Sequence, residues 1–299
     1  MNTSIERPLK SQSYSPTHTQ QLEVSGEFNG VAVNANADTG SSFNIISQTL
    51  ASKLGLKTKP STDGYIPLPS GKRIYSPGVV HGTFTFSGEK KTHALICIVL
   101  ERTTHALVLG SKFLRITQTM TLYANRLKKK FSKLISLKLL GGHQDLLSGY
   151  LNGVGCSVVP DTGSDIMAMS SAYARKLGLK IRKGRSHRCR VQFVDGSLGF
   201  TSGVVRNVRW KFRQEDAPIK CDFHIMDDLP VNAIVSNAFL NEFDVFSKYE
   251  DLIIEQEPEE DEAGIYGISL IEKYRNEIRS LEGQYVEDSE YKLAGDLLL

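Results

Sequence analysis

The chain consists largely of short runs in which hydrophobic and polar residues alternate, and each run ends near Gly, Pro or Asn. Examples are Val79 to Phe86, Ala94 to Leu100, Val204 to Phe212 and Cys221 to Met226. A period of two predicts strands with one buried face, and many short strands at this spacing favour a small closed β structure over a parallel α/β sheet. The predicted fold class is therefore all-β with short helices.

Turn and cap signals place a hairpin and a helix in the first part of the chain. Residues 22–37 are typical of two strands joined at Asn29-Gly30, a pair that favours a tight hairpin turn. Ser47 can cap a short helix from Gln48 to Leu54, which Gly55 would stop. The same helix signals recur later at Ser170 or Ser171 and at Gly178.

These recurring signals belong to an internal repeat. Residues 25–57 align with residues 148–180 without a gap, at an offset of 123 (148 − 25), and 16 of the 33 pairs are identical. Such similarity indicates duplication of one folding unit. The match continues more weakly downstream, which predicts two domains of about 100 residues each, at 21–120 and 145–248.

The best-matched part of the repeat is Asp38-Thr39-Gly40-Ser41 against Asp161-Thr162-Gly163-Ser164. Two carboxylates about 3 Å apart cannot both ionise easily, so they share a proton and can act together as acid and base on a peptide bond. Such a pair needs one aspartate from each of two similar units, and Asp38 and Asp161 can supply both from one chain. Thr39 and Thr162 can lock the loops by hydroxyl hydrogen bonds, and Gly40 and Gly163 let the backbone turn tightly beside the carboxylates. The resemblance described next implies that the two aspartates are the catalytic pair and that the two glycines shape the water site.

The frame around both motifs resembles the retropepsin-like aspartic proteases. Asp-Thr-Gly-Ser is followed by paired Ile or Met, then Ala-x-Lys-Leu-Gly-Leu, then a Gly hairpin and a closing apolar element. The pattern is most similar to gypsy-type retrotransposon proteases and their cellular relatives, over residues 22–118 and 145–246. The resemblance implies two tandem closed β barrels that form an intramolecular pseudo-dimer, with the active site at their interface and flaps over a polypeptide substrate. The candidate substrate contacts are Ser41, Ser42, Ser164, Asp165, Ser70, Gly71, Asp195 and Gly196.

The two copies differ from each other and from this pattern. Val235-Ser236 stands where copy one has Leu109-Gly110, and Asp165 stands where copy one has Ser42. Two functions therefore remain open: an aspartic endopeptidase, and a catalytically inactive binding or dimerisation module. Pairing between two chains, copy one with copy one, is a further alternative that would make the protein a homodimer. A pepsin-like enzyme is less favoured, because such enzymes have a wider separation between their motifs.

The remaining segments are predicted to connect or extend the two domains. Residues 1–20 are polar and are expected to be a disordered tail. Residues 121–144 form a basic linker with a solvated basic face, in which Leu127, Phe131, Leu134 and Lys138 recur at helical spacing. Residues 249–299 are predicted to be an acidic linker followed by an amphipathic C-terminal helix over 265–282.

Composition limits the classes of partner and the cellular compartments that we expect. The formal charge is only +3 over 299 residues, which does not favour a nucleic-acid partner. Four cysteines far apart, without Cys-x-x-Cys or a nearby His pair, argue against a metal site, and we expect no cofactor. No apolar run is long enough to span a membrane, and the N-terminus has no signal-peptide core, so a cytoplasmic or nuclear location is expected.

Overall fold

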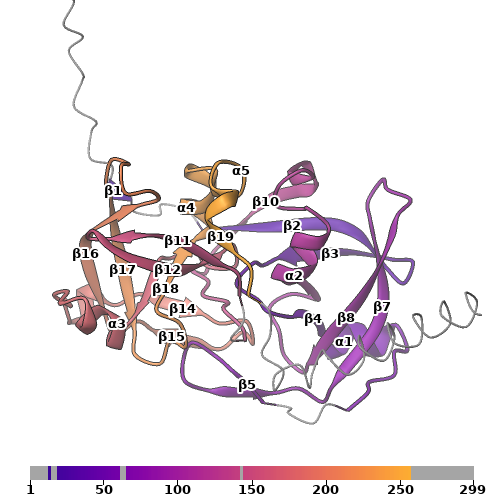
Figure 1. Ribbon diagram of the computed structural model, residues 1–299. Coiled ribbons are helices and arrows are strands. Elements are labelled where there is room, and N and C mark those ends of the chain that lie inside the picture. Colours follow the sequence, from indigo (N-terminus) through magenta and orange to yellow (C-terminus); the bar gives the residue numbers. More distant parts are fainter. Residues whose placement is uncertain (1–12, 15–18, 61–64, 142–143, 257–299) are drawn as a thin grey trace, which may run out of the picture. The chain divides into compact units, whose positions relative to one another are not determined.

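The computed structural model describes residues 13–14, 19–60, 65–141 and 144–256, and these form two closed β barrels, one from each repeat (Figure 1). Both barrels belong to one compact unit. The predicted all-β class with short helices is confirmed. The predicted C-terminal helix and most of the acidic linker lie outside the described residues.

In the first barrel, six strands pair in the order β2-β3-β9-β4-β8-β7, and β7 pairs back with β2 to close the ring. The phenylalanines Phe84, Phe86 and Phe113 pack against one another in its core. The strands are β2 (Thr19–Phe28), β3 (Val31–Ala37), β4 (Asn44–Ser47), β7 (Val79–Phe86), β8 (Thr92–Leu100) and β9 (Leu107–Leu109). The helices are α1 (Gln48–Lys53), α2 (Ser111–Ile116) and η1 (Ala124–Arg126).

The second barrel repeats this topology with the order β11-β12-β18-β13-β17-β16, and β16 pairs back with β11. Trp210 is fully buried in its core, where it packs against Phe212 and Phe239. The strands are β11 (Leu146–Leu151), β12 (Val154–Asp161), β13 (Ala168–Ser170), β16 (Gly203–Lys211), β17 (Ile219–Met226) and β18 (Ala233–Ser236). The helices are α3 (Ser171–Lys176), η2 (Arg185–His187), α4 (Asn237–Glu242), α5 (Val245–Lys248) and η3 (Glu250–Leu252).

The local signals in the sequence act in both barrels. Asn29 and Gly30 have φ values of 49° and 76°, the left-handed conformation that a two-residue hairpin turn requires. Asn152-Gly153 adopts the same turn. The hydroxyls of Ser47 and Ser170 each accept a hydrogen bond of 3.1 Å from the helix that follows, and so cap α1 and α3.

The tail and the linker differ from expectation. Ser13–Tyr14 form β1, which pairs with β17, and Thr19 and Gln20 begin β2, so these parts of residues 1–20 are ordered strands. Leu127–Ser132 form a strand, β10, instead of a helix, because their backbone pairs with β2 on the side away from β3. The predicted solvated face is wrong for Lys138, which is 0% exposed. The second barrel also extends beyond residue 248 to β19 (Ile253–Ile254), which pairs with β11.

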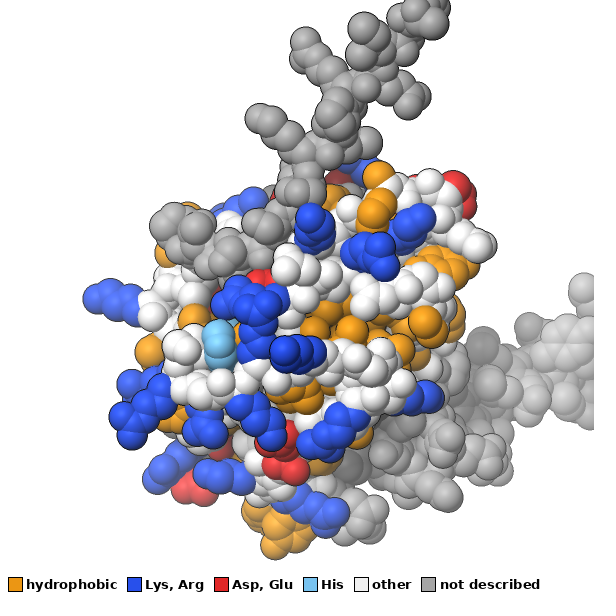
Figure 2. All heavy atoms as spheres, turned by 90° about the vertical axis from the view of Figure 1, so that its left-hand side faces the viewer, with side chains coloured by type: hydrophobic (Ala, Val, Ile, Leu, Met, Phe, Trp, Pro, Cys, Tyr) orange, Lys and Arg blue, Asp and Glu red, His pale blue; other side chains and the backbone are white. Residues whose placement is uncertain are grey.

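The surface of the second barrel carries a basic region. Lys and Arg side chains are spread over the side seen in Figure 2. Between Asp165 and Asp195 the sequence has no Asp or Glu, and eight Lys and Arg residues from α3 to β14 (Arg190–Gln192) are exposed. The small net charge of the whole chain therefore conceals a local excess of positive charge. Among the described helices, none has the length and hydrophobicity needed to cross a membrane.

Candidate active site

The two Asp-Thr-Gly motifs lie at equivalent places in the two barrels. Asp38 directly follows β3, and Asp161 is the last residue of β12. In the first barrel β3 pairs in parallel with β9, and in the second barrel β12 pairs in parallel with β18. Both aspartates are 0% exposed. The duplication thus delivers one buried carboxyl group from each barrel to the same interface.

The threonines join the two motifs by reciprocal hydrogen bonds. The backbone N–H of Thr39 donates to the hydroxyl of Thr162, and the N–H of Thr162 donates to the hydroxyl of Thr39, both at 3.0 Å. Each hydroxyl in turn donates to a backbone carbonyl of the opposite strand, Thr39 to Pro160 and Thr162 to Ala37. These four buried bonds fix the two loops relative to each other.

The glycines bring each carboxyl group against the opposite loop. A Cβ built on Gly40 would lie 2.2 Å from Cγ of Asp161, and one built on Gly163 would lie 2.3 Å from Oδ2 of Asp38. A side chain at either position would force the opposite carboxyl group to move, so this close approach favours glycine. Each glycine N–H also donates to the aspartate of its own motif, at 3.0 Å for Gly40 and 2.7 Å for Gly163.

The two carboxyl groups are chemically unequal. Burial, followed by the negative charge of Asp161, raises the pKa of Asp38 well above its usual value. Burial also raises the pKa of Asp161, but hydrogen bonds from the Ser164 hydroxyl and the Gly163 N–H, and the contact with Asp38, oppose this increase. In the first loop the corresponding hydroxyl, Ser41, donates instead to the Phe43 carbonyl at 2.7 Å. These contacts favour the ionised form of Asp161 over that of Asp38.

The predicted substrate contacts next to the motifs lie at the barrel interface. Ser41 and Ser164 are fully buried. Ser42 and Asp165 occupy equivalent positions of the repeat (165 − 42 = 123). The Asp165 carboxylate accepts hydrogen bonds from the N–H groups of Gln20 and Ser136, at 3.0 and 2.7 Å. Burial raises its pKa to about 6.

The other predicted contacts lie at the tips of two hairpins. Ser70 and Gly71 connect β5 (Tyr65–Pro67) to β6 (Arg73–Tyr75), and Asp195 and Gly196 connect β14 to β15 (Leu198–Phe200). Each hairpin reaches the other barrel. A Cβ on Gly71 would lie 2.8 Å from the carboxyl group of Asp228, and the N–H of Thr104 donates to the Val194 carbonyl at 2.9 Å. The Asp195 side chain itself caps its turn by accepting from Ser197.

Sequence reasoning missed a buried cation beside the pair of aspartates. Nζ of Lys138 lies 3.5 Å from Oδ1 of Asn36 and 3.4 Å from Nδ1 of His105. Burial lowers the pKa of Lys138 to about 8, and the charges of Asp38, Asp165 and Asp161 oppose this decrease. The unusually polar strand before Asp38, which contains Asn36, was the available signal in the sequence.

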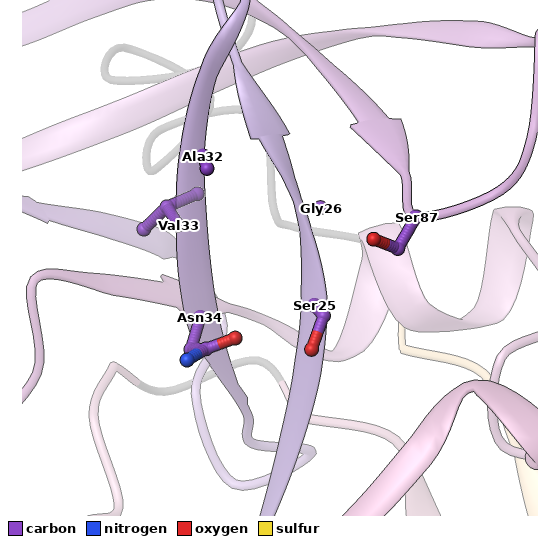
Figure 3. A pocket seen from close by; sticks show the side chains of 6 residues that line it. All are labelled: Ser25, Gly26, Ala32, Val33, Asn34 and Ser87. Atoms are coloured by element: carbon purple, nitrogen blue, oxygen red, sulfur yellow. The ribbon is translucent and has the colours of Figure 1, made fainter.

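A separate pocket of about 210 Å³ lies on the first barrel, away from these groups (Figure 3). It is lined by residues of β2 and β3 and by Ser87 after β7, and none of its lining side chains is charged. No cluster of potential metal ligands occurs within the described ranges. The barrel interface is therefore the place where reactive groups converge.

Among solved structures, this chain is similar to the crystal structure of the retroviral protease-like domain of Ddi1 from Leishmania major, with 21% identity over 38% of this chain and 93% of that domain, at a TM-score of 0.29. No curated protein matches the chain. Residues 24–113, which carry Asp38, match the family model described as aspartyl protease.

Proposed function

We propose that this protein is an aspartic endopeptidase that hydrolyses peptide bonds with the pair Asp38 and Asp161. The observation that carries the proposal is the close approach of two fully buried carboxyl groups, each against the glycine of the opposite motif. The match of residues 24–113 to the aspartyl protease family supports it independently. We further propose that both barrels are retropepsin-like units, related to gypsy-type proteases and arranged in tandem.

The unequal carboxyl groups suggest the roles in the reaction. The ionised Asp161 takes a proton from a water molecule, whose oxygen forms a bond to the carbonyl carbon of the substrate. Asp38 supplies its proton as the C–N bond breaks, so that the products are a carboxyl group and an amine. The proton taken from water remains on the pair, which restores the starting charge. The threonine bonds hold both loops in place during these steps.

A second function is favoured by one specific observation. A segment of the chain's own linker lies buried beside the aspartates, as Lys138 shows. A fold that binds an extended peptide without cleaving it would have the same appearance. The alternative function is therefore a catalytically inactive peptide-binding module.

The proposal is tested by incubating a denatured protein with this chain between pH 3 and pH 8 and identifying the products by mass spectrometry. We expect cleavage that is strongest at acid pH and is abolished by Asp38→Asn or by Asp161→Asn. The matched control is Asp222→Asn, at a surface carboxylate that pairs with Arg206. Cleavage that survives either dyad substitution would contradict the proposed dyad, and the variants described below separate a blocked enzyme from an inactive one.

A further inference from the structure

The linker between the barrels contains a continuous buried segment, residues 136–141. This segment is part of the chain that connects β10 to β11, and its three leucines and Lys138 are almost inaccessible to solvent. A connection between two domains normally runs over the surface, because its backbone groups need hydrogen-bond partners. Here the backbone groups find their partners in the loops that carry the two aspartates and in one hairpin.

The end of the segment binds the first Asp-Thr-Gly loop. The N–H of Leu140 donates to the Gly40 carbonyl at 3.0 Å, and the Leu140 carbonyl accepts from the N–H of Ser42 at 2.9 Å. The side-chain amide of Gln144 reinforces this contact by donating to the carbonyls of Gly40 and Leu140. The segment thus forms a parallel β-bridge with the first loop, between Leu140 and Ser41.

The start of the segment binds the second loop in a corresponding way. The Ser136 carbonyl accepts from the N–H of Asp165 at 2.9 Å, and the Ser136 N–H donates to the Asp165 carboxylate at 2.7 Å. The hairpin strand β14 pairs with the same stretch through the backbone of Gln192. Its carbonyl accepts from the N–H of Leu137 at 3.0 Å, and its N–H donates to the Ile135 carbonyl at 2.8 Å. The segment is therefore held between a loop and a hairpin.

The two anchors locate the part of the segment that faces the aspartates. Ser42 and Asp165 are equivalent residues, and they bind the carbonyls of residues 140 and 136. The carbonyl midway between these two is that of Lys138. The charge of Lys138 acts on both Asp38 and Asp161, as expected for a residue at this midpoint.

The side chain of Lys138 occupies a pocket with matching chemistry. His105 is neutral, because burial lowers its pKa to about 3, and its Nε2–H donates to Oε1 of Gln21 at 2.9 Å. Its Nδ1 can therefore accept from the ammonium group at 3.4 Å, and Oδ1 of Asn36 lies at 3.5 Å. Polar acceptors and nearby carboxylates stabilise the ammonium group of the lysine. The neighbouring side chains of Leu137, Leu139 and Leu140 are apolar and buried.

We propose that residues 135–141 occupy the peptide-binding groove of this chain in the manner of a substrate, with the Lys138–Leu139 bond presented to Asp38 and Asp161. The segment thereby competes with other peptides for the groove, and the substrate class is an extended peptide with Lys before and Leu after the cleaved bond. The cleavage part rests on the proposed endopeptidase function, whereas the occupation of the groove does not.

The test uses a fluorescent synthetic peptide with the sequence of residues 133–141 and full-length variants in which the linker is displaced. Ser136→Pro with Leu140→Pro removes the two N–H donors toward Asp165 and Gly40. Lys138→Glu, a second displacing variant, places a negative charge among carboxylates. Lys133→Pro, at an exposed position of the same linker, is the matched control.

We expect the folded displaced variants to bind the peptide at least tenfold more tightly than the parent and Lys133→Pro, as measured by fluorescence anisotropy. Equal binding by all of these proteins, with native circular dichroism, would overturn the proposal. In the parent, hydrogen exchange should show protected amides at Leu137 and Leu140, and rapid exchange there would overturn the proposal without any variant.

The same peptide separates the two proposals. Products that end at the lysine, made by a displaced variant but not after adding Asp161→Asn, support both. Tight binding without any cleavage supports the occupied groove and removes the endopeptidase. Cleavage of denatured protein without peptide binding at the groove supports the endopeptidase and removes the linker proposal. Cleavage at another bond of the peptide overturns the assignment of Lys138–Leu139.

Discussion

A single methyl group at Gly163 tests whether the two motifs meet as described. A Cβ at this position would lie 2.3 Å from Oδ2 and 2.4 Å from Oδ1 of Asp38. Heavy-atom contacts of a real Cβ are essentially never shorter than 3.0 Å. The Asp38 carboxyl group must therefore move by at least about 0.7 Å (3.0 − 2.3), or the two barrels must separate by a similar amount.

The expected loss of stability follows from the bonds at this site. Overpacking of a well-packed interior costs about 1–3 kcal/mol. Movement of the carboxyl group also weakens the hydrogen bond that it accepts from Gly40 at 3.0 Å. Because Asp38 favours its protonated form, this is a bond between neutral groups, which contributes about 0.5–1.5 kcal/mol. Gly163→Ala should thus lower the free energy of unfolding by about 1.5–4.5 kcal/mol. A displacement near 1 Å should also reduce any peptide cleavage by about 100-fold.

Urea unfolding followed by circular dichroism measures this loss, with Gly155→Ala, in the strand β12 that leads to this loop, as the control. A Cβ on Gly155 would meet only Cε1 of Tyr150, at an ordinary distance of 3.9 Å. We expect the control to change the free energy of unfolding by less than about 1 kcal/mol. Equal stability of Gly163→Ala and Gly155→Ala would refute the argument, because the Asp38 carboxyl group could not then lie against Gly163.

Three further predictions concern the interface and the groove. Thr39→Val and Thr162→Val should each lower the free energy of unfolding in urea by about 1–3 kcal/mol, because each leaves a buried N–H without its acceptor. The double variant should lose less than the sum of the two single losses, because both threonines belong to one hydrogen-bond network. Strictly additive losses would argue against reciprocal bonds. The raised pKa of Asp165 favours its protonated form in the folded state, so this group adds stability as the pH falls from about 6 towards 3.8. The unfolding free energy of the parent relative to Asp165→Asn should rise over that range, by at most about 3 kcal/mol, and a constant difference would contradict the raised pKa. Finally, the parent held at acid pH should slowly yield a fragment ending at Lys138 in mass spectrometry, whereas a chain that stays intact would contradict hydrolysis of the bound segment.

The turns and helix starts of each barrel could be predicted from local sequence signals. Asn29-Gly30 permits a left-handed turn, and Ser47 supplies a cap oxygen three residues before the N–H that it binds. These interactions involve neighbours in the chain, so their signals are readable without the fold. Because of the internal repeat, the same turn and cap signals occur in the second barrel.

The linker could not be predicted in this way. Lysine is rarely buried without a partner, so a solvated Lys138 was the natural expectation. Its partners are Asn36 and His105, with Asp38, Asp161 and Asp165 nearby, and they come from segments that only the closed interface brings together. The strand β10 likewise depends on the outer side of β2, because Leu127–Ser132 alone show no alternation.

The most direct test of the central claim is the peptidase activity of Asp38→Asn and Asp161→Asn, each made in the displaced variant Ser136→Pro/Leu140→Pro and measured separately and as a mixture. If one chain holds one complete dyad, each substitution should lower the rate by at least about 100-fold, and mixing should restore nothing. If instead two chains pair copy one with copy one and copy two with copy two, each single variant keeps one intact site. About half of the activity remaining in each variant would therefore contradict a dyad formed by Asp38 and Asp161 within one chain.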